Sequence, residues 1–272
     1  MTLEAMDTAH TAFVTLTYRD DALIYSIQAK APTLIPNDLS LWLKRFRKAT
    51  GETGMRFYAV GEYSPAERPH YHIILYGYKG CHYGKSRYRD GHTIDCCSQC
   101  DLVRDTWGKG IIETQQAAPE HFSYAAGYVM KKMTSPKDKR LNGRYPEFSR
   151  QSNRAGGIGI NKVKELAIVA QKRLADGTAQ DVPDHVRIDG KKALLGRYIR
   201  MKIRKELGGD GKAPPHIVEE MEAQMLPLLA KSRIDPENIT LKKQLVSRAS
   251  TAIASIKARH EMNNSRKRNR SL

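Results

Sequence analysis

Apolar and polar positions alternate with two different periods along the first part of the chain. Residues Phe13–Tyr18 alternate with period two and are rich in β-branched and aromatic side chains, which predicts a strand. A helical period follows, with four large apolar residues on one face: Leu39, Trp42, Leu43 and Phe46. We expect a helix here, with Asn37 or Asp38 as its cap and Gly51 at its end.

Three further strands and a second helix complete this region. The segments Met55–Gly61 and His70–Tyr76 are predicted strands, separated by a turn at Ser64–Pro69. A short strand at Ile111–Thr114 precedes a helix over about residues 119–133. The order strand, helix, strand, strand, strand, helix predicts an α+β fold, a central antiparallel sheet with its helices on one face.

The C-terminal region is predicted to be mainly helical and basic. Helical patterns cover about residues 161–174, 195–207, 216–229 and 240–259. Asp189-Gly190 between apolar residues predicts a hairpin, and the basic run at 265–270 predicts disorder. We divide the chain into a core at 1–155 with an irregular cysteine-containing insert at 78–106, a helical accessory region at 156–262, and a basic tail at 263–272.

Charge and cysteine usage narrow the choice of partner and compartment. The chain has 46 Lys and Arg against 29 Asp and Glu, a net charge of +17. So one-sided a surplus indicates a polyanionic partner, because Lys and Arg that neutralise phosphates release counterions. No apolar run of about 18 residues predicts a membrane span, and Met1–His10 lacks the apolar segment of a secretory signal. The four cysteines cluster tightly, which indicates a reducing, cytosolic compartment.

A histidine pair stands at the start of the third predicted strand. His70 and His72 are two residues apart, so their side chains share a face while Tyr71 points the other way. Such a pair can bind one divalent cation, and an ion that activates phosphate also needs a hard oxygen ligand. Of the two nearby acids we choose Glu62 over Glu67, because a strand end is better fixed than a turn. Two ordinary strand histidines are the alternative, but a position at the rim of the strand favours a site.

A tyrosine pair lies on the second predicted helix. Tyr124 and Tyr128 are four residues apart, so their hydroxyls share a face, and Lys131 and Lys132 follow about one turn later. A tyrosine hydroxyl is a weak nucleophile at its ordinary pKa near 10. A bound metal and a lysine can compensate by polarising a phosphate and stabilising its transition state. Helix packing is the alternative, but the small residues at 125–127 leave room for a ligand.

Taken together, three segments resemble the motifs of HUH rolling-circle replication initiators. Phe13–Tyr18 resembles their first motif, Arg68–Gly77 their metal-binding motif, and Tyr124–Lys132 their two-tyrosine motif. Within that class the chain is most similar to the replication initiation proteins of small microviruses of the gokushovirus type, over roughly residues 13–200. Further segments that fit this group are Gly61–Tyr63, Trp107–Gly108, Glu147–Ser149, Gly157–Gly159, Asp189–Lys191 and Arg197-Tyr198.

The resemblance implies an enzyme that nicks single-stranded DNA at a phage origin, forms a 5′-phosphotyrosine intermediate and rejoins the displaced strand. It also implies a ferredoxin-type core, with the histidines on a middle strand beside the tyrosine helix. Host helicase and polymerase would be partners, and the host bacterial cytoplasm the location. The implied residue roles are binding of Mg²⁺ or Mn²⁺ by His70, His72 and Glu62, nucleophilic attack by Tyr124 and Tyr128, and assistance by Lys131.

The cysteine cluster departs from this resemblance. Cys97 and Cys100 form a Cys-x-x-Cys pair, a zinc signal in a reducing compartment. Candidates to complete a tetrahedral site are Cys81, Cys96, His82 and His92. No second Cys-x-x-Cys pair exists, so free thiols are the alternative. A Zn²⁺ ion here would brace the insert and stay outside the chemistry.

Basic residues after the tyrosine helix are candidates for DNA contact. Residues 134–154 are polar and are predicted to form a loop or basic strap. Any one of these side chains could equally belong to a solvated basic loop. The candidates for phosphate contacts are Lys132, Arg140, Arg144, Arg150 and Arg154.

Other functions fit part of the pattern. A non-catalytic RNA- or DNA-binding protein built like an RNA-recognition module would use Tyr71 and Tyr76 for base stacking. DNA binding that survives chelators, without strand cleavage, would indicate that function. An HUH transposase or relaxase would share the chemistry, but such transposases usually carry one tyrosine. A structural zinc protein built on the cysteine cluster is a weaker third alternative.

Overall fold

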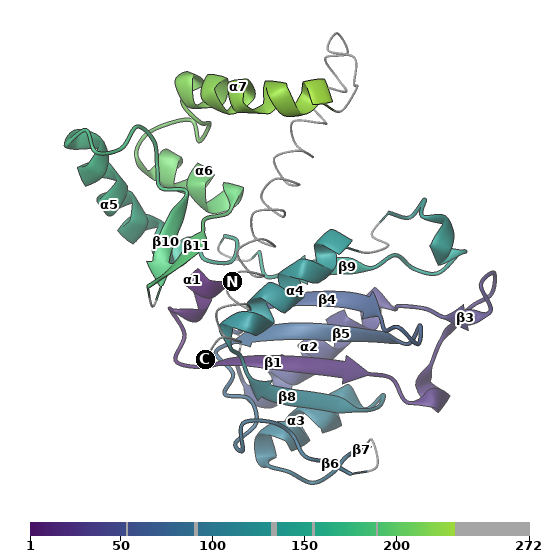
Figure 1. Cartoon of the computed structure of the whole chain (residues 1–272). Helices are drawn as coiled ribbons and strands as arrows, with labels where there is room; N and C mark the ends of the chain where they lie inside the picture. Colours follow the sequence, from purple (N-terminus) through teal and green to yellow (C-terminus); the bar gives the residue numbers. More distant parts are fainter. Residues whose placement is uncertain (53, 90–91, 132–134, 154–155, 189, 232–272) are drawn as a thin grey trace, which may run out of the picture. The chain divides into compact units, whose positions relative to one another are not determined.

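The computed structural model describes residues 1–52, 54–89, 92–131, 135–153, 156–188 and 190–231 (Figure 1). The chain divides into two compact units, Met1–Leu166 and Ala167–Leu272. The helix predicted at 240–259 and the basic tail predicted at 263–272 lie outside the described residues.

A five-stranded sheet forms the centre of the first unit. Its strands are β1 (Thr11–Thr17), β4 (Arg56–Tyr63), β5 (Pro69–Tyr76), β8 (Ile112–Gln116) and β9 (Phe148–Gln151). The order is β8-β1-β5-β4-β9, and each neighbouring pair is antiparallel. The predicted α+β class with a central antiparallel sheet is therefore confirmed, and the strand that carries the histidines is the middle one.

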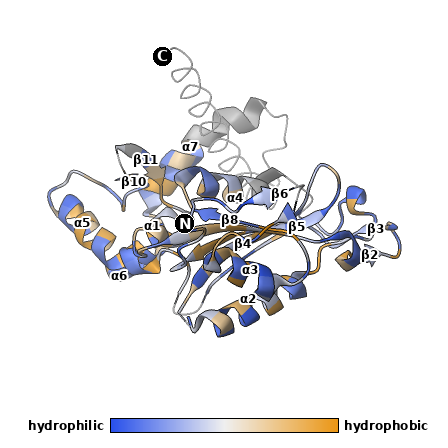
Figure 2. Cartoon of the chain, turned by 90° about the horizontal axis from the view of Figure 1, so that it is seen from below, coloured by the Kyte–Doolittle hydropathy of each residue, from blue (hydrophilic) through white to orange (hydrophobic). Residues whose placement is uncertain are grey.

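Helices cover both faces of this sheet, so the prediction of helices on one face was wrong. Figures 1 and 2 show α2 (Pro36–Thr50) and α3 (Ser98–Trp107) on one side, and α4 (Pro119–Lys131) on the other. The reason is that the central strands are apolar on both faces. Residues that pack on the α2 and α3 side include Val14, Leu16, Tyr71 and Ile73. Residues that pack on the α4 side include Phe13, Ile74, Tyr76, Phe122 and Ala125.

Helix α2 buries the face that its period predicts. Its four large apolar residues are at most 5% exposed, and the helix ends at Gly51. The predicted cap was wrong, because Ile35 occupies the N-cap position and Pro36 the first turn. Asp38 is instead buried, where it accepts a hydrogen bond from the Tyr18 hydroxyl at 2.8 Å and pairs with Lys109 at 3.3 Å.

Two elements were not predicted. Helix α3 occupies the end of the insert that we expected to be irregular, and strand β9 lies in the expected basic strap. Strand β9 pairs with β4, with Gly61 opposite Phe148. A Cβ atom on Gly61 would lie only 2.6 Å from the Phe148 ring, so this close pairing requires glycine.

Shorter elements complete the first unit. They are α1 (Thr2–Ala5), β2 (Tyr25–Ser26), β3 (Ala31–Pro32), β6 (Tyr88–Arg89), β7 (His92–Thr93), and 3-10 turns at Asp20–Ala22, Lys139–Leu141 and Ile160–Lys162. The buried Glu4 of α1 accepts a hydrogen bond from the Gly159 amide at 2.6 Å and pairs with Arg56 at 2.9 Å. These contacts attach the segment after residue 155 to the first unit, whose boundary lies at Leu166.

Helix α5 (Val163–Ala175) spans the boundary between the units, and the second unit continues with a hairpin and two helices. Its elements are β10 (His185–Ile188), β11 (Lys191–Leu194), α6 (Arg197–Glu206) and α7 (Pro215–Lys231). The hairpin predicted around Gly190 is confirmed. Asp181 pairs with Arg200 at 3.1 Å and with Arg204 at 2.6 Å. Among the described residues, no helix has the length and apolar character needed to cross a membrane.

Candidate active site

The pairing of β4 with β5 brings one carboxylate and two imidazoles together. Glu62 lies directly opposite His70 in the antiparallel register, and His72 follows on the same face of β5. The Oε1 atom of Glu62 lies 2.7 Å from His70 Nε2 and 2.9 Å from His72 Nε2. The structure therefore assembles the three side chains that the sequence singled out, and one potential ligand atom from each lies within 4.8 Å of the others.

The far side of each imidazole is held by an oxygen atom. His70 Nδ1 lies 3.1 Å from the carbonyl oxygen of Arg68, and because a carbonyl only accepts, Nδ1 is the donor. His72 Nδ1 lies 3.0 Å from the Thr15 hydroxyl of β1. Both rings are thus oriented with Nε2 toward Glu62. Fixing a histidine through its second nitrogen is the way proteins orient metal-ligating imidazoles.

Burial and hydrogen bonding set the charges at this site. Burial alone would raise the pKa of Glu62, but hydrogen bonds from His70 and His72 outweigh it and hold the pKa at about 2. Burial lowers the pKa of His72, against the opposing effect of Glu62. At neutral pH the site therefore offers an ionised carboxylate beside a neutral His72 imidazole, the protonation states in which these groups bind cations.

Aromatic rings connect the site to helix α4. Phe13 stacks on His72 with ring centroids 5.5 Å apart, and on His121 with centroids 4.7 Å apart. Tyr124 meets His72 edge to face at 5.1 Å. Tyr124 is 43% exposed, so its ring lies where the buried histidine meets solvent. A nucleophile at this position can reach both the site and a bound polymer.

Some predicted residues lie outside this description. Tyr128 and Lys131 belong to α4, one turn or more after Tyr124, but their side chains are not among those described. Lys132 and Arg154 lie outside the described residues.

The sequence analysis missed three residues on this face of the sheet or on α4: Thr15, Glu113 and His121. Thr15 pairs with both His72 and Glu113, so a single row of the sheet carries all three. Glu113 lies 2.9 Å from Lys85. The available signal for Thr15 was its polar character between Val14 and Leu16, since alternation assigns it to the face opposite theirs.

Comparisons with known proteins relate this region to viral replication proteins. Residues 11–134, just under half of the chain, match a family model of replication-associated proteins of the ORF2 type. The chain is also similar to the replication-associated protein ORF2 of Spiroplasma virus 4. The two are 29% identical over 165 residues, which cover 57% of this chain and 48% of the viral protein. The chain thus spans about half the length of this curated relative. No solved structure matches it.

The matched residues begin at β1 and run past the end of α4. They therefore include the carboxylate, both histidines and both tyrosines of the candidate site. The similarity and the side-chain geometry single out the same part of the molecule.

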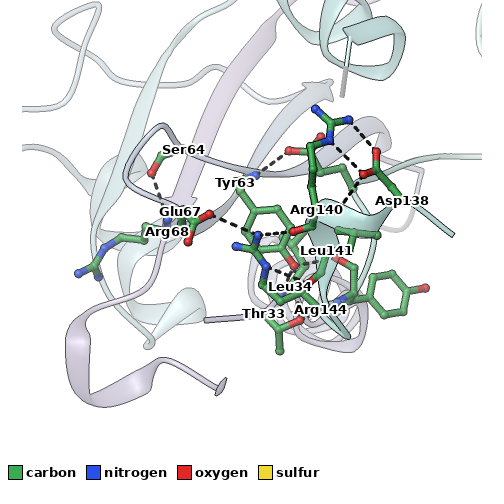
Figure 3. Close-up of polar contacts among 12 residues, drawn as sticks. Thr33, Leu34, Tyr63, Ser64, Glu67, Arg68, Asp138, Arg140, Leu141 and Arg144 are labelled. Atoms are coloured by element: carbon green, nitrogen blue, oxygen red, sulfur yellow. Dashed lines mark hydrogen bonds and ion pairs between the residues drawn. The ribbon is translucent and has the colours of Figure 1, made fainter. Parts of the chain in front are cut away.

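Three of the candidate DNA-contacting arginines are described, and they differ in availability. Figure 3 shows Arg144 among Glu67, Arg140 and Leu141. Its guanidinium lies 4.7 Å from the centroid of the Tyr63 ring and donates to the carbonyl oxygens of Arg140 and Leu141. Arg144 is only 7% exposed, so it is a structural residue and we withdraw it as a phosphate contact.

The other two described arginines are exposed. Arg140 forms two hydrogen bonds from its guanidinium to Asp138, at 3.0 and 2.6 Å (Figure 3). Arg150 donates to the Ser40 hydroxyl at 2.7 Å. Both remain candidates for contact with a polyanion.

The two tyrosines proposed for base stacking are unavailable. Tyr71 is fully buried and its hydroxyl donates to the Ile35 carbonyl oxygen at 2.9 Å. Tyr76 is 1% exposed. A module that stacks bases needs aromatic rings on the surface, so the structure contradicts this version of the binding-protein alternative.

The four cysteines converge at a second place in the first unit. One Sγ atom from each of Cys81, Cys96, Cys97 and Cys100 lies within 4.8 Å of the others. Cys81 and Cys100 are buried in the core on the α2 and α3 side of the sheet. The cluster therefore packs with the face opposite to the one that carries His70 and His72.

Proposed function

We propose that this protein is a replication initiator that makes a metal-dependent, site-specific nick in single-stranded DNA and holds the cut end on a tyrosine. The observation that carries the proposal is the convergence of Glu62, His70 and His72 beneath Tyr124. The family match and the similarity to a viral replication-associated protein support the biological setting. The net charge of +17 fits a nucleic-acid substrate.

The donor set fits a hard divalent cation such as Mg²⁺ or Mn²⁺. Adjacent ligands of an octahedral ion with bonds of about 2.1 Å lie about 3 Å apart. The separations of 2.7 and 2.9 Å between Glu62 Oε1 and the two Nε2 atoms are close to that spacing. Three ligands on one side leave other positions open for phosphate and water. When bound, the ion would supply Lewis-acid polarisation of a phosphate oxygen.

The protein's own residues then account for the transfer. Glu62, His70 and His72 hold the scissile phosphate's counter-charge in one place, and Tyr124 stands over that place. The phenol oxygen forms a bond to phosphorus, the bond from phosphorus to the 3′ oxygen breaks, and the phenol proton is balanced by one gained at the 3′ hydroxyl. The 5′ phosphate stays on the tyrosine as an ester, so the reaction needs no external energy source to rejoin strands.

A second tyrosine four residues along the same helix extends this chemistry. After replication the phenol of the other tyrosine, Tyr128 or Tyr124, attacks the regenerated junction. The freed 3′ hydroxyl then attacks the first phosphotyrosine and closes the displaced strand. Lys131 would stabilise the transition-state charge, and Lys132, Arg140, Arg150 and Arg154 would contact DNA phosphates.

We assign the protein to the HUH class of initiators, as found in small single-stranded DNA phages of the microvirus type. The nick would expose a 3′ hydroxyl for a host polymerase, and a host helicase would open the duplex ahead of it. The reaction would take place in the cytoplasm of the bacterial host.

The test is formation of a covalent protein–DNA adduct. The full chain is incubated with Mn²⁺ and labelled single-stranded oligonucleotides tiled across the genome that encodes it, then resolved on a denaturing gel. We expect an adduct with one origin-containing oligonucleotide and none after chelation. The variant Y124F together with Y128F should form no adduct, while DNA binding by gel shift is retained.

Matched controls separate the chemistry from binding. The single variants Y124F and Y128F should each retain part of the adduct if the tyrosines act in turn. Y145F changes an exposed tyrosine outside α4 and should leave the yield unchanged. An adduct that persists in the double variant, or that forms equally well in excess chelator, would refute the proposal.

A further inference from the structure

We propose that Cys81, Cys96, Cys97 and Cys100 bind one structural Zn²⁺ ion, separate from the candidate active site. This inference does not rest on the proposed nicking activity. It rests on the convergence of four sulfur atoms from three separate stretches of the chain. These are all the cysteines that the chain contains.

The spacing of the sulfurs fits tetrahedral zinc. With Zn–S bonds of about 2.3 Å, the corners of a regular tetrahedron lie about 3.8 Å apart. The Sγ atoms of Cys81 and Cys96 are 3.7 Å apart, and every Sγ pair lies within 4.8 Å. A disulfide would need about 2.05 Å, and all four cysteines are free.

The type of donor distinguishes this cluster from the Glu62 site. Four sulfur ligands are soft and select zinc or iron, whereas oxygen and imidazole ligands suit Mg²⁺ and Mn²⁺. A closed set of four protein ligands leaves no open position for a substrate, which is the arrangement of structural zinc sites. The chain would thus keep two metals apart by ligand chemistry.

The surroundings suit a site that holds negative charge. The backbone N–H of His82 donates to Cys97 Sγ at 3.4 Å. Cys97 is the N-cap of α3 and Cys100 lies in its first turn, where the helix dipole favours negative charge. Such backbone donors commonly orient and stabilise the thiolates around a metal.

Ordinary packing explains the arrangement less well. A cysteine used as a small apolar side chain fills a gap in the core, and Cys81 and Cys100 are buried enough to do so. Cys96 and Cys97 are only partly buried, yet both contribute a sulfur to the same point. Packing needs no such convergence of adjacent residues, but a metal site does.

The ion would join the end of the central sheet to the start of α3. Cys81 follows β5, and the other three ligands lie at or beside the N-terminus of α3. At the far end of that helix, the Trp107 indole donates to the Thr17 carbonyl oxygen of β1 at 3.2 Å. Zinc at one end and this hydrogen bond at the other would fix α3 against the sheet, and close the segment between Cys81 and Cys96 into a loop.

Metal content of the purified full chain provides the first test. The chain is purified in reducing buffer without chelator, after growth with zinc, and its metals are measured by mass spectrometry. We expect about one zinc per chain, retained in H70A with H72A and lost in C81S and in C97S. Without zinc, a thiol reagent should modify all four cysteines rapidly; with zinc, modification should be slow.

A second measurement does not depend on the variants folding. The wild-type chain is stripped of metal and reloaded with Co²⁺, which gives thiolate charge-transfer bands and the visible bands of a tetrahedral ion. Because every cysteine of the chain lies in the cluster, thiolate bands can arise nowhere else. Zinc should displace the cobalt and abolish the bands, while Mg²⁺ should not.

The outcomes are distinct. About one zinc per chain with tetrahedral cobalt bands supports the site. Iron as the main metal, a Cys81–Cys96 disulfide in the reduced protein, or fast modification of all four thiols in zinc would overturn it. Loss of nicking with zinc retained would count against the proposed function alone.

Discussion

The Glu62 site and the cysteine cluster are built in different ways. Glu62, His70 and His72 lie on two adjacent strands, and one register places all three. The four cysteines lie on a loop and at a helix N-terminus, and no repeating pattern relates Cys81 to Cys97. Each group brings its potential ligand atoms within 4.8 Å of one another.

The difference teaches how far local sequence carries a prediction. The period of a strand is two, so His70 and His72 must share a face wherever the strand lies. A loop has no such period, and Cys81 meets Cys96 only because the chain between them returns. The sheet site suits exchangeable chemistry on an open face, and the cysteine cluster suits a closed structural role.

The largest expected effect is on the sheet site. E62Q keeps the shape of the side chain but removes its charge, so adduct formation in saturating Mn²⁺ should fall on the order of 100- to 1000-fold. Zinc content should stay the same. The matched control is E67Q, which alters the other acid near the pair, in the turn between β4 and β5. Equal losses in the two variants would deny Glu62 a specific role.

The cysteine cluster should respond in stability rather than in rate. A site filled a thousandfold above its dissociation constant adds about 4 kcal/mol, which for a unit of this size is about 10 °C in Tm. C81S should therefore lower the Tm by about 10 °C in calorimetry, and chelation should lower the wild-type Tm to a similar value. At a temperature where C81S is folded, its adduct yield should match wild type. A variant as stable as wild type would rule out a bracing ion.

A smaller effect is expected from the support of His72. T15V removes the hydroxyl that lies 3.0 Å from His72 Nδ1, so the Mn²⁺ concentration for half-maximal cleavage should rise about 10- to 100-fold. The maximal rate should change little. The control is T17V on the same strand and face, because the Nδ1 atom of His70 is held by a backbone carbonyl instead. An unchanged Mn²⁺ dependence in T15V would show that ring orientation does not need this contact.

The smallest effect concerns the edge of the sheet. In G61A the new Cβ would lie 2.6 Å from the Phe148 ring, so β9 must shift and the unfolding free energy should fall by about 1–3 kcal/mol. Denaturant melts measure this loss, and zinc content should be unaffected. G54A is the control, since a Cβ there meets nothing within 4 Å. Equal stability of G61A and wild type would mean that β9 is not closely paired.

The predicted fold was correct where residue patterns repeat and wrong where they do not. Strands β1, β4, β5 and β8 and helices α2 and α4 follow their periods. Helix α3 lies in a cysteine-containing segment with a weak period, and β9 in a basic segment, so neither was predicted. Arg144 looked like a phosphate ligand from its neighbours, but contact with Tyr63 buries it, and no local pattern reports such a contact.

By itself, the sequence determined which side chains share a face and which atoms they offer, because strand and helix periods are properties of the backbone. It therefore identified the histidine pair, the tyrosine spacing and the cysteine types. Only the tertiary structure decided that Glu62 stands opposite His70, that Thr15 supports His72, and that α4 covers the face opposite α2. Those facts depend on strand register and on packing between distant segments, which are fixed only when the whole unit closes around its core.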